Sequence, residues 1–165
     1  MTDSPLVRDA TLGDFEQLAD VWHEAWHDAH EAIVPRELTR IRTRDNFRSR
    51  LPAMLPNLRV AVPNGRIVGL CATREDELHQ LFVARDARGS GAAAALIADA
   101  ERRLREAGVK IAWLACAIGN GRAARFYERN GWQRVRTMTN LSETDRGTFS
   151  LDVWRYEKAL GTNAP

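Results

Sequence analysis

Two glycines and a run of four alanines stand near the middle of the chain, between an apolar segment and a helical pattern. The glycines belong to Arg88-Gly89-Ser90-Gly91, and the segment that begins at Ala92 repeats apolar residues at helical spacing. A helix N-terminus leaves four backbone N–H groups unpaired and carries roughly half a positive charge, so it binds anions when side chains leave the approach open. The residues alone therefore allow two interpretations: a flexible loop before an ordinary helix, or a helix start that binds an anion.

The segments around this helix alternate between strand and helix patterns. Residues 77–83 precede it as a strand, and residues 110–117 follow it as a nearly continuous apolar run typical of a strand covered on both faces. The helix thus belongs to a β-helix-β unit. We expect further strands over 6–10, 58–62, 66–74, 133–139 and 148–157, and further helices over 15–29, 36–54 and 121–129. The pattern predicts an α/β fold with a mixed central sheet flanked by helices.

Composition limits the classes of protein to which the chain can belong. Its 165 residues, 44% of them hydrophobic and 28% charged, suit one domain spanning residues 1–165. The net charge of +2 is too small to indicate a nucleic-acid partner, and no apolar run approaches the roughly 20 residues of a membrane span. The first ten residues show no basic start followed by an apolar stretch, so we expect no secretion signal, and Cys71 and Cys116 lie in apolar segments, as expected of reduced thiols. These features predict a cytoplasmic protein without a membrane partner.

Two motifs, in order and separated by a strand, carry a resemblance to a known family. The first, Gln/Arg-x-x-Gly-x-Gly/Ala, is matched by Arg88, Gly91 and Ala93. The second, Asn-x-x-Ala-x-x-x-Tyr-x-x-x-Gly-Phe, is matched by Asn120, Ala123, Tyr127 and Gly131, with Trp132 in place of phenylalanine. Together they resemble the GNAT acyltransferases over about residues 77–132. The resemblance implies a single-domain GNAT-type fold with an acyl-CoA-binding β-helix-β core. It also implies an N-acetyltransferase that moves an acetyl group from acetyl-CoA to a primary amine by direct attack in a ternary complex.

The same resemblance assigns the contacts of the co-substrate. The pyrophosphate of coenzyme A would lie on backbone amides of residues 89–94, and the pantetheine arm would pair with the backbone of residues 81–83 at a splayed sheet edge. Asn120 would hydrogen-bond that arm, although the residue is equally suited to capping the helix that begins at Gly121. The full implied set is Leu81, Phe82, Val83, Arg88, Gly89, Ser90, Gly91, Ala92, Ala93, Ala94, Asn120 and Phe126.

Catalysis would need a proton acceptor for the amine and a proton donor for the thiolate that leaves. The family motif places Tyr127 near the sulfur, which predicts a general acid; the alternative is an aromatic packing residue with a satisfied hydroxyl. Strand alternation puts Glu77 and His79 on one side, together with Leu81 and Val83. In various members of this family a glutamate or histidine on this strand acts as base, sometimes through water, so the resemblance leaves both as candidates.

The segment His23-Glu24-Ala25-Trp26-His27 is a literal match to the His-Glu-x-x-His pattern of zinc hydrolases. An extended zinc-protease pattern would need a glycine at position 30 and a histidine at position 33, where the chain has His30 and Ile33. The segment also falls where GNAT proteins place their first helix, beside the acceptor. We therefore expect no metal, and assign Trp22, Trp26, His27 and His30 to the core and the acceptor pocket.

Other classes and partners stay open at this stage. The basic run over residues 36–50 is better explained by a solvated helix face than by a nucleic-acid surface, because it includes Glu37 and Asp45. A non-catalytic acyl-CoA-binding or regulatory module is an alternative that the presence of Tyr127 and Asn120 disfavours. The acceptor would be a small-molecule or peptide amine. Because many relatives dimerise through sheet edges or terminal strands, a homodimer is a further expectation.

Overall fold

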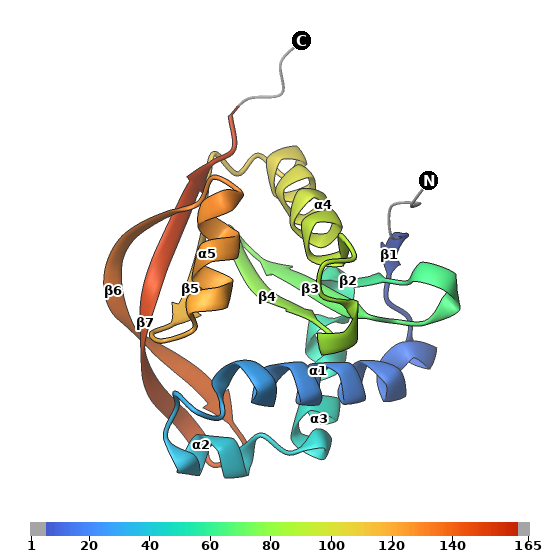
Figure 1. Cartoon of the computed structure of the whole chain (residues 1–165), viewed down its shortest axis with the longest axis vertical. Helices are drawn as coiled ribbons and strands as arrows, with labels where there is room; N and C mark the ends of the chain where they lie inside the picture. The colour runs from blue at the N-terminus through green and yellow to red at the C-terminus, as the bar shows by residue number, and fades with distance from the viewer. Residues whose placement is uncertain (1–5, 162–165) are drawn as a thin grey trace.

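The computed structural model describes residues 6–161, which form a seven-stranded sheet flanked by helices (Figure 1). The strands are β1 Val7–Asp9, β2 Leu58–Ala61, β3 Gly69–Arg74, β4 Glu77–Val83, β5 Ile111–Ala117, β6 Gln133–Thr144 and β7 Gly147–Ala159. The helices are α1 Phe15–His30, α2 Arg36–Ile41, α3 Arg44–Met54, α4 Ala92–Glu106 and α5 Gly121–Arg129. The strand order is β1-β2-β3-β4-β5-β7-β6, which confirms the mixed α/β fold. None of the helices within residues 6–161 combines the length and the apolar character that crossing a membrane requires.

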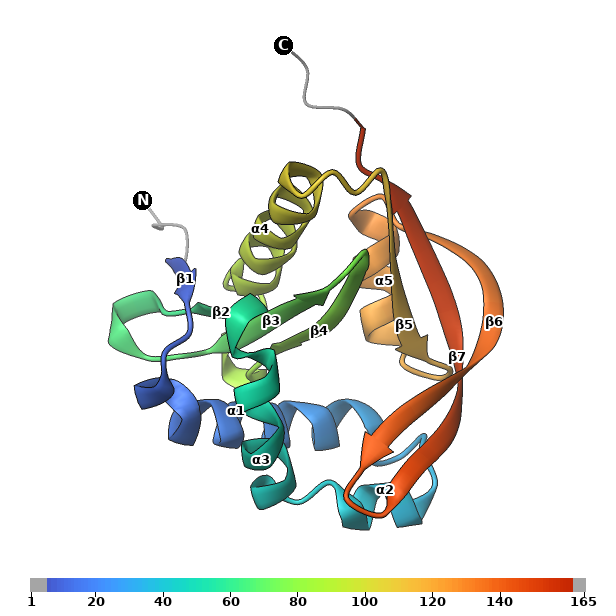
Figure 2. The same cartoon turned by 180° about the vertical axis from the view of Figure 1, so that it is seen from behind.

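Strands β4 and β5 form the parallel pair of this sheet, and they are joined through α4 as the β-helix-β prediction requires. Their register contains the single pair Glu77 and Trp113, whereas the antiparallel pairing of β5 with β7 runs over the whole length of β5. Beyond that one pair β4 and β5 diverge, as the ribbon shows from both sides (Figures 1 and 2). The sheet is therefore open between its two halves.

Two apolar clusters pack on the two faces of the sheet. One lies under α4 and α5 and includes Leu96, Ile97 and Trp132, all essentially inaccessible to solvent. The other lies under α1 and α3 and includes Trp22 and Phe47, whose ring centroids are 4.8 Å apart. The apolar stripes that predicted these helices are thus their buried faces.

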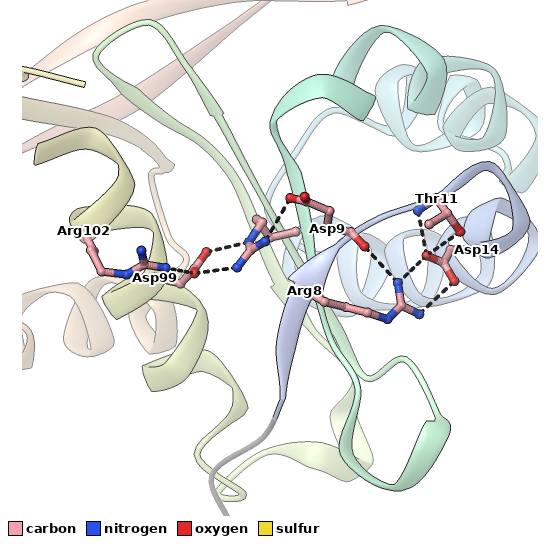
Figure 3. Close-up of polar contacts among 7 residues, drawn as sticks. Arg8, Asp9, Thr11, Asp14, Asp99 and Arg102 are labelled. Carbon is pink, nitrogen blue, oxygen red and sulfur yellow. Dashed lines mark hydrogen bonds and ion pairs between the residues drawn. The ribbon is translucent and has the colours of Figure 1, made fainter. Parts of the chain in front are cut away.

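A network of charged side chains attaches α4 to the N-terminal strands (Figure 3). Arg59 of β2 donates two hydrogen bonds to the buried carboxylate of Asp99 on α4, at 3.1 and 3.0 Å, and a third to Asp9 of β1. On the other side of β1, Arg8 binds Asp14, which also accepts a bond from the backbone N–H of Thr11. Bidentate arginine–carboxylate pairs have a fixed geometry, so this network sets the position of α4 on the sheet.

Two regions differ most from the sequence-based prediction. The single helix expected over residues 36–54 is wrong: it is divided into α2 and α3 at Arg42 and Thr43, because Thr43 caps a new helix by accepting a hydrogen bond from the backbone N–H of Asn46. Strands β6 and β7 extend five residues and one residue farther into their connecting turn than expected, to Thr144 and from Gly147. The longer hairpin reaches the region of α2 (Figure 2).

Candidate active site

A cavity of about 960 Å³ passes through the opening between β4 and β5. One part of its lining comes from the start of α4, from β5 and from α5. The other part comes from α1, α3 and the β6–β7 hairpin, while all seven residues of β4 border it. The cavity therefore connects the two faces of the sheet, and two molecules could meet within it.

The start of α4 forms one end of this cavity. Gly91 precedes the helix with a φ of 91°, and Gly89 has a φ of 79°, a backbone conformation that favours glycine. The N–H groups of Ala93 and Ala94 lie in the first turn, where no carbonyl within the helix can accept them, and both residues border the cavity. The helix start is thus open to an anion, as the interpretation of an anion site requires. Ser90 is absent from the lining; its hydroxyl donates to the carbonyl of Ala87 at 2.5 Å.

Arginine side chains add positive charge beside this helix start. Arg88 forms an ion pair with Asp28 of α1, and Arg122 of α5 and Arg85 approach the same carboxylate at 3.5 and 3.8 Å. Arg88 and Arg122 border the cavity. Three guanidinium groups around one carboxylate leave a net positive charge, which suits the phosphates of coenzyme A. Sequence reasoning identified Arg88 and missed Asp28 and Arg122, because the two come from distant helices.

The opening between the strands suits an extended pantetheine arm. Leu81, Phe82 and Val83 of β4 border the cavity on one side, and residues 115–117 of β5 border it on the other. Because no register pair joins the strands at this level, backbone groups on the facing edges are free of strand partners. An extended chain could pair with those edges as an added strand does.

Glu77 lies at the start of β4, 5% exposed and at the edge of the cavity. Its Oε1 accepts hydrogen bonds from the guanidinium of Arg74 at 2.9 and 3.3 Å and lies 3.5 Å from Nδ1 of His79. Within residues 6–161, no hydrogen bond or ion pair engages Oε2. One oxygen thus fixes the carboxylate, and the other is available to a substrate.

A β-bulge in β4 changes which side chains share a face. Ala72 and Thr73 are neighbours in β3, and they pair with Gln80 and Leu78 of β4. His79 lies between these two paired residues and has no partner of its own in β3. As a result Leu78, Leu81 and Val83 pack with the cluster under α4, whereas Phe82 packs with the cluster under α1. The expectation that Leu81 and Val83 share a face with Glu77 is therefore wrong, because the bulge reverses the alternation between them.

Tyr127 of α5 borders the same cavity as Glu77 of β4. Its ring packs against Trp132 and Tyr156, with centroids 6.4 and 6.0 Å away, and no residue within 6–161 hydrogen-bonds its hydroxyl. Burial, followed by the nearby thiols of Cys116 and Cys71, raises the pKa of Tyr127 well above its usual value. The hydroxyl therefore stays protonated and can donate a hydrogen bond into the cavity.

Asn120 caps α5, because its Oδ1 accepts a hydrogen bond from the backbone N–H of Ala123 at 3.3 Å. The residue also borders the cavity, as does Phe126 on the same helix. The cap engages the oxygen of the side chain and leaves its amide nitrogen, a donor, for a ligand. Both roles suggested by the sequence are thus compatible with one position.

The histidines of α1 make contacts typical of packed side chains. Nε2 of His27 lies 2.6 Å from the carbonyl of Arg42, to which it donates a hydrogen bond, and Nδ1 of His30 lies 3.0 Å from the carbonyl of Trp26. Among the residues that the structure describes, no three His, Cys, Asp or Glu side chains are grouped as metal ligands.

The expected acceptor pocket is only partly formed by the residues proposed for it. Trp26 and His30 border the cavity, while Trp22 and His27 do not. Trp22 is fully buried against Phe47, and His27 is turned toward Arg42. The placement of Trp22 and His27 in the acceptor pocket is corrected accordingly. Sequence reasoning also missed Asn46 and Arg50 of α3 and Arg42, which directly follows α2; all three border the cavity.

Comparisons with known proteins agree on one family. Residues 15–132 match the acetyltransferase (GNAT) family. A GCN5-related N-acetyltransferase from Rhodopseudomonas palustris has a TM-score of 0.76 at 18% identity, covering 96% of this chain and 98% of that one. The PaiA N-acetyltransferase from Thermoplasma acidophilum, in complex with coenzyme A, has a TM-score of 0.72 at 18% identity, covering 95% and 99%. YncA from Salmonella typhimurium, with its cofactor acetyl-CoA, has a TM-score of 0.66 at 15% identity, covering 99% and 98%. At these identities the likeness shows the fold; no curated protein sequence matches the chain.

Proposed function

Since the chain belongs to the GNAT acetyltransferase family and is an acyltransferase, we propose that it transfers the acetyl group of acetyl-CoA directly to a primary amine. The observation that carries the proposal is the one cavity that the start of α4, Glu77 and Tyr127 share. Similar folds solved with coenzyme A and with acetyl-CoA support the choice of co-substrate. Acetyl-CoA supplies an acyl group activated as a thioester.

Each end of the cavity has a part in holding that co-substrate. The N–H groups of Ala93 and Ala94 and the guanidinium groups of Arg88 and Arg122 would bind the phosphates. The backbone edge of residues 81–83 and the amide nitrogen of Asn120 would hold the pantetheine arm. This arrangement leaves the thioester between Glu77 and Tyr127.

In the proposed reaction a carbon–nitrogen bond forms and the carbon–sulfur bond breaks. Oε2 of Glu77 takes a proton from the substrate ammonium, since only the neutral amine is a nucleophile. Tyr127 gives a proton to the departing sulfur, and the second proton lost by the nitrogen restores the hydroxyl of Tyr127. The proton taken up by Glu77 is the one released to solvent. His79 lies 3.5 Å from Oε1 of Glu77 and holds the carboxylate in place, although the same position makes it the other candidate base.

The test is a turnover assay with acetyl-CoA against a broad panel of primary amines. Release of free coenzyme A thiol and formation of the acetylated amine in equal amounts would support the proposal. Binding of acetyl-CoA by calorimetry without acetylation of any amine would contradict it, and would favour a non-catalytic acyl-CoA-binding module.

A further inference from the structure

Two arginines and an asparagine border the part of the cavity that lies toward α3. Arg42 is 3% exposed, and its guanidinium donates to Oδ1 of Asn46 at 2.9 Å and to the backbone carbonyl of Glu143 at 3.0 Å. The guanidinium of Arg50 lies over the ring of Trp22, 4.5 Å from its centroid. Within residues 6–161, no carboxylate lies within ion-pair distance of Arg42 or Arg50.

The absence of acidic partners for Arg42 and Arg50 in the described part of the chain contrasts with the paired arginines Arg44 and Arg48 of α3. Arg44 pairs with Glu16 and Asp20 of α1, and Arg48 pairs with Glu16. The acidic residues of α1 thus neutralise the exposed arginines of α3, while Glu143 and Asp145, the acidic residues that act on Arg50 and Arg42, border the cavity beyond ion-pair distance. Taking a charge out of water is costly unless an opposite charge compensates it. A bound anion would therefore stabilise the guanidinium groups of Arg42 and Arg50.

The electrostatics of Arg50 reflect the same arrangement. Burial lowers the pKa of Arg50 to about 9, and the positive charge of Arg42 acts in the same direction, while Glu143 opposes it. The two guanidinium groups therefore repel each other across this end of the cavity. A negatively charged ligand placed between them would remove that repulsion.

Asn46 adds hydrogen-bond donors of fixed orientation. A guanidinium can only donate, so the atom that faces Arg42 must be the Oδ1 acceptor, and the amide nitrogen must be turned the other way. No residue within 6–161 accepts from that nitrogen, and Asn46 borders the cavity. The donors of Asn46 and Arg50 together match the two oxygens of a carboxylate.

We infer that the acceptor is a small amino carboxylate, whose carboxylate is bound by Arg50 and Asn46 while its amine faces Glu77. The inference rests on the proposed acetyl transfer and names its substrate class. Residues 140–145 of the β6–β7 hairpin border this end of the cavity, and the carbonyl of Glu143 is bonded to Arg42. The hairpin therefore covers the carboxylate end, which favours a free amino acid or a similar small molecule over a protein chain.

The experiment compares free amino acids with their carboxamides as acceptors. The carboxamide keeps the shape, loses the negative charge and carries a less basic amine, so a preference for the acid cannot come from the amine. We expect kcat/KM to be at least roughly tenfold higher for the preferred acid than for its carboxamide. A matched aminophosphonate distinguishes the two kinds of anion: a preference for it over the acid would overturn the assignment to a carboxylate.

Three variants locate the effect. Arg50→Met keeps an apolar stem over Trp22, and should lower the ratio of kcat/KM for acid over carboxamide to near one; Arg50→Lys should retain part of it. Arg48→Met, on the outer face of the same helix, should leave the ratio unchanged. If amines are acetylated without regard to a carboxylate, or if Arg50→Met and Arg50→Lys preserve the ratio, this inference fails while the proposed function stands. If no amine is acetylated, both fail.

Discussion

Nδ1 of His79, the extra residue of the bulge in β4, lies 3.5 Å from Oε1 of Glu77, and both residues border the cavity. The same Oε1 accepts both bonds from Arg74, so all the polar contacts of the carboxylate fall on one oxygen. A carboxylate held in this way keeps a defined orientation with one oxygen free, which is what a general base requires.

Replacing Glu77 by glutamine should produce a defect that depends on pH. Glu77→Gln keeps the shape of the side chain but cannot accept the proton of the amine. We expect the rate constant for transfer to fall by roughly 10²–10⁴-fold at low pH, where the amine is mostly charged. The loss should shrink as rising pH deprotonates the amine in solution. Pre-steady-state transfer rates measured across the pH range check this.

His79→Ala is the comparison for that experiment. If Glu77 is the base, the Ala variant should show a smaller defect with no recovery at high pH. A defect of Glu77→Gln that is equal at every pH, together with recovery in His79→Ala, would instead assign the base to His79.

Replacing Tyr127 by phenylalanine should separate catalysis from binding. Tyr127→Phe keeps the ring that packs on Trp132 and Tyr156 and removes only the hydroxyl. Without that proton donor the rate constant for transfer should fall by roughly 10²–10⁴-fold. The affinity for acetyl-CoA, measured by calorimetry, should change little. An unchanged transfer rate would mean that the hydroxyl has no part in the departure of the thiol.

Sequence reasoning placed the parts of the site that depend on local signals. Strand β4 and helix α5 have the predicted boundaries to the residue, 77–83 and 121–129. Local chemistry marks the starts of two helices: Asn120 caps α5, and Gly91 in the left-handed region ends the loop before α4. Such signals depend on a few neighbouring residues, and can therefore be recognised without the rest of the chain.

The features that sequence reasoning missed depend on residues far apart in the chain. The bulge at His79 exists only relative to β3, so the alternation expected for β4 could not reveal it. The basic run over 36–50 was expected to be one solvated face, which holds for Arg44 and Arg48 but not for Arg42 and Arg50. Only the packing of α3 against α1 and the β6–β7 hairpin distinguishes these arginines.

A negative charge in the first turn of α4 should weaken binding of acetyl-CoA without harming the fold. Ala94→Glu tests this better than a substitution of Gly91, whose φ of 91° would strain any other residue. An acidic residue at a helix start favours the helix but repels a phosphate placed there. We expect the Kd for acetyl-CoA to rise at least roughly tenfold, about 1.4 kcal/mol, by calorimetry.

Ala98→Glu serves as the control, since Ala98 is exposed one turn farther along α4 and does not border the cavity. Its affinity for acetyl-CoA should stay close to that of the unchanged protein. Equal affinities in both variants would return the glycine segment to the interpretation of a flexible loop.

The His-Glu-x-x-His segment should bind no stoichiometric metal. Among the described residues no three His, Cys, Asp or Glu side chains are grouped so as to hold a metal ion, and Nε2 of His27 is engaged in a hydrogen bond to the carbonyl of Arg42. Metal analysis of the purified protein should find far less than one equivalent of zinc, and chelators should leave acetyl transfer intact. Zinc near one equivalent, lost together with activity on chelation, would contradict the assignment of this helix.

The stability of the fold should fall between pH 7 and pH 5 because of His30. Burial lowers the pKa of His30 to about 4, whereas an unfolded histidine titrates near 6.5. Between these values the unfolded state binds more protons than the folded state, so the free energy of unfolding decreases as the pH is lowered. One pKa unit corresponds to about 1.4 kcal/mol, so His30 should lower the free energy of unfolding by about 2 kcal/mol at pH 5.

Urea unfolding at pH 7 and pH 5 measures this loss of stability, and His30→Gln should show a smaller loss. His23→Gln, which replaces a less buried histidine on the same helix, should retain most of the pH dependence; an equal loss in the protein and in His30→Gln would show that His30 is protonated in the folded state.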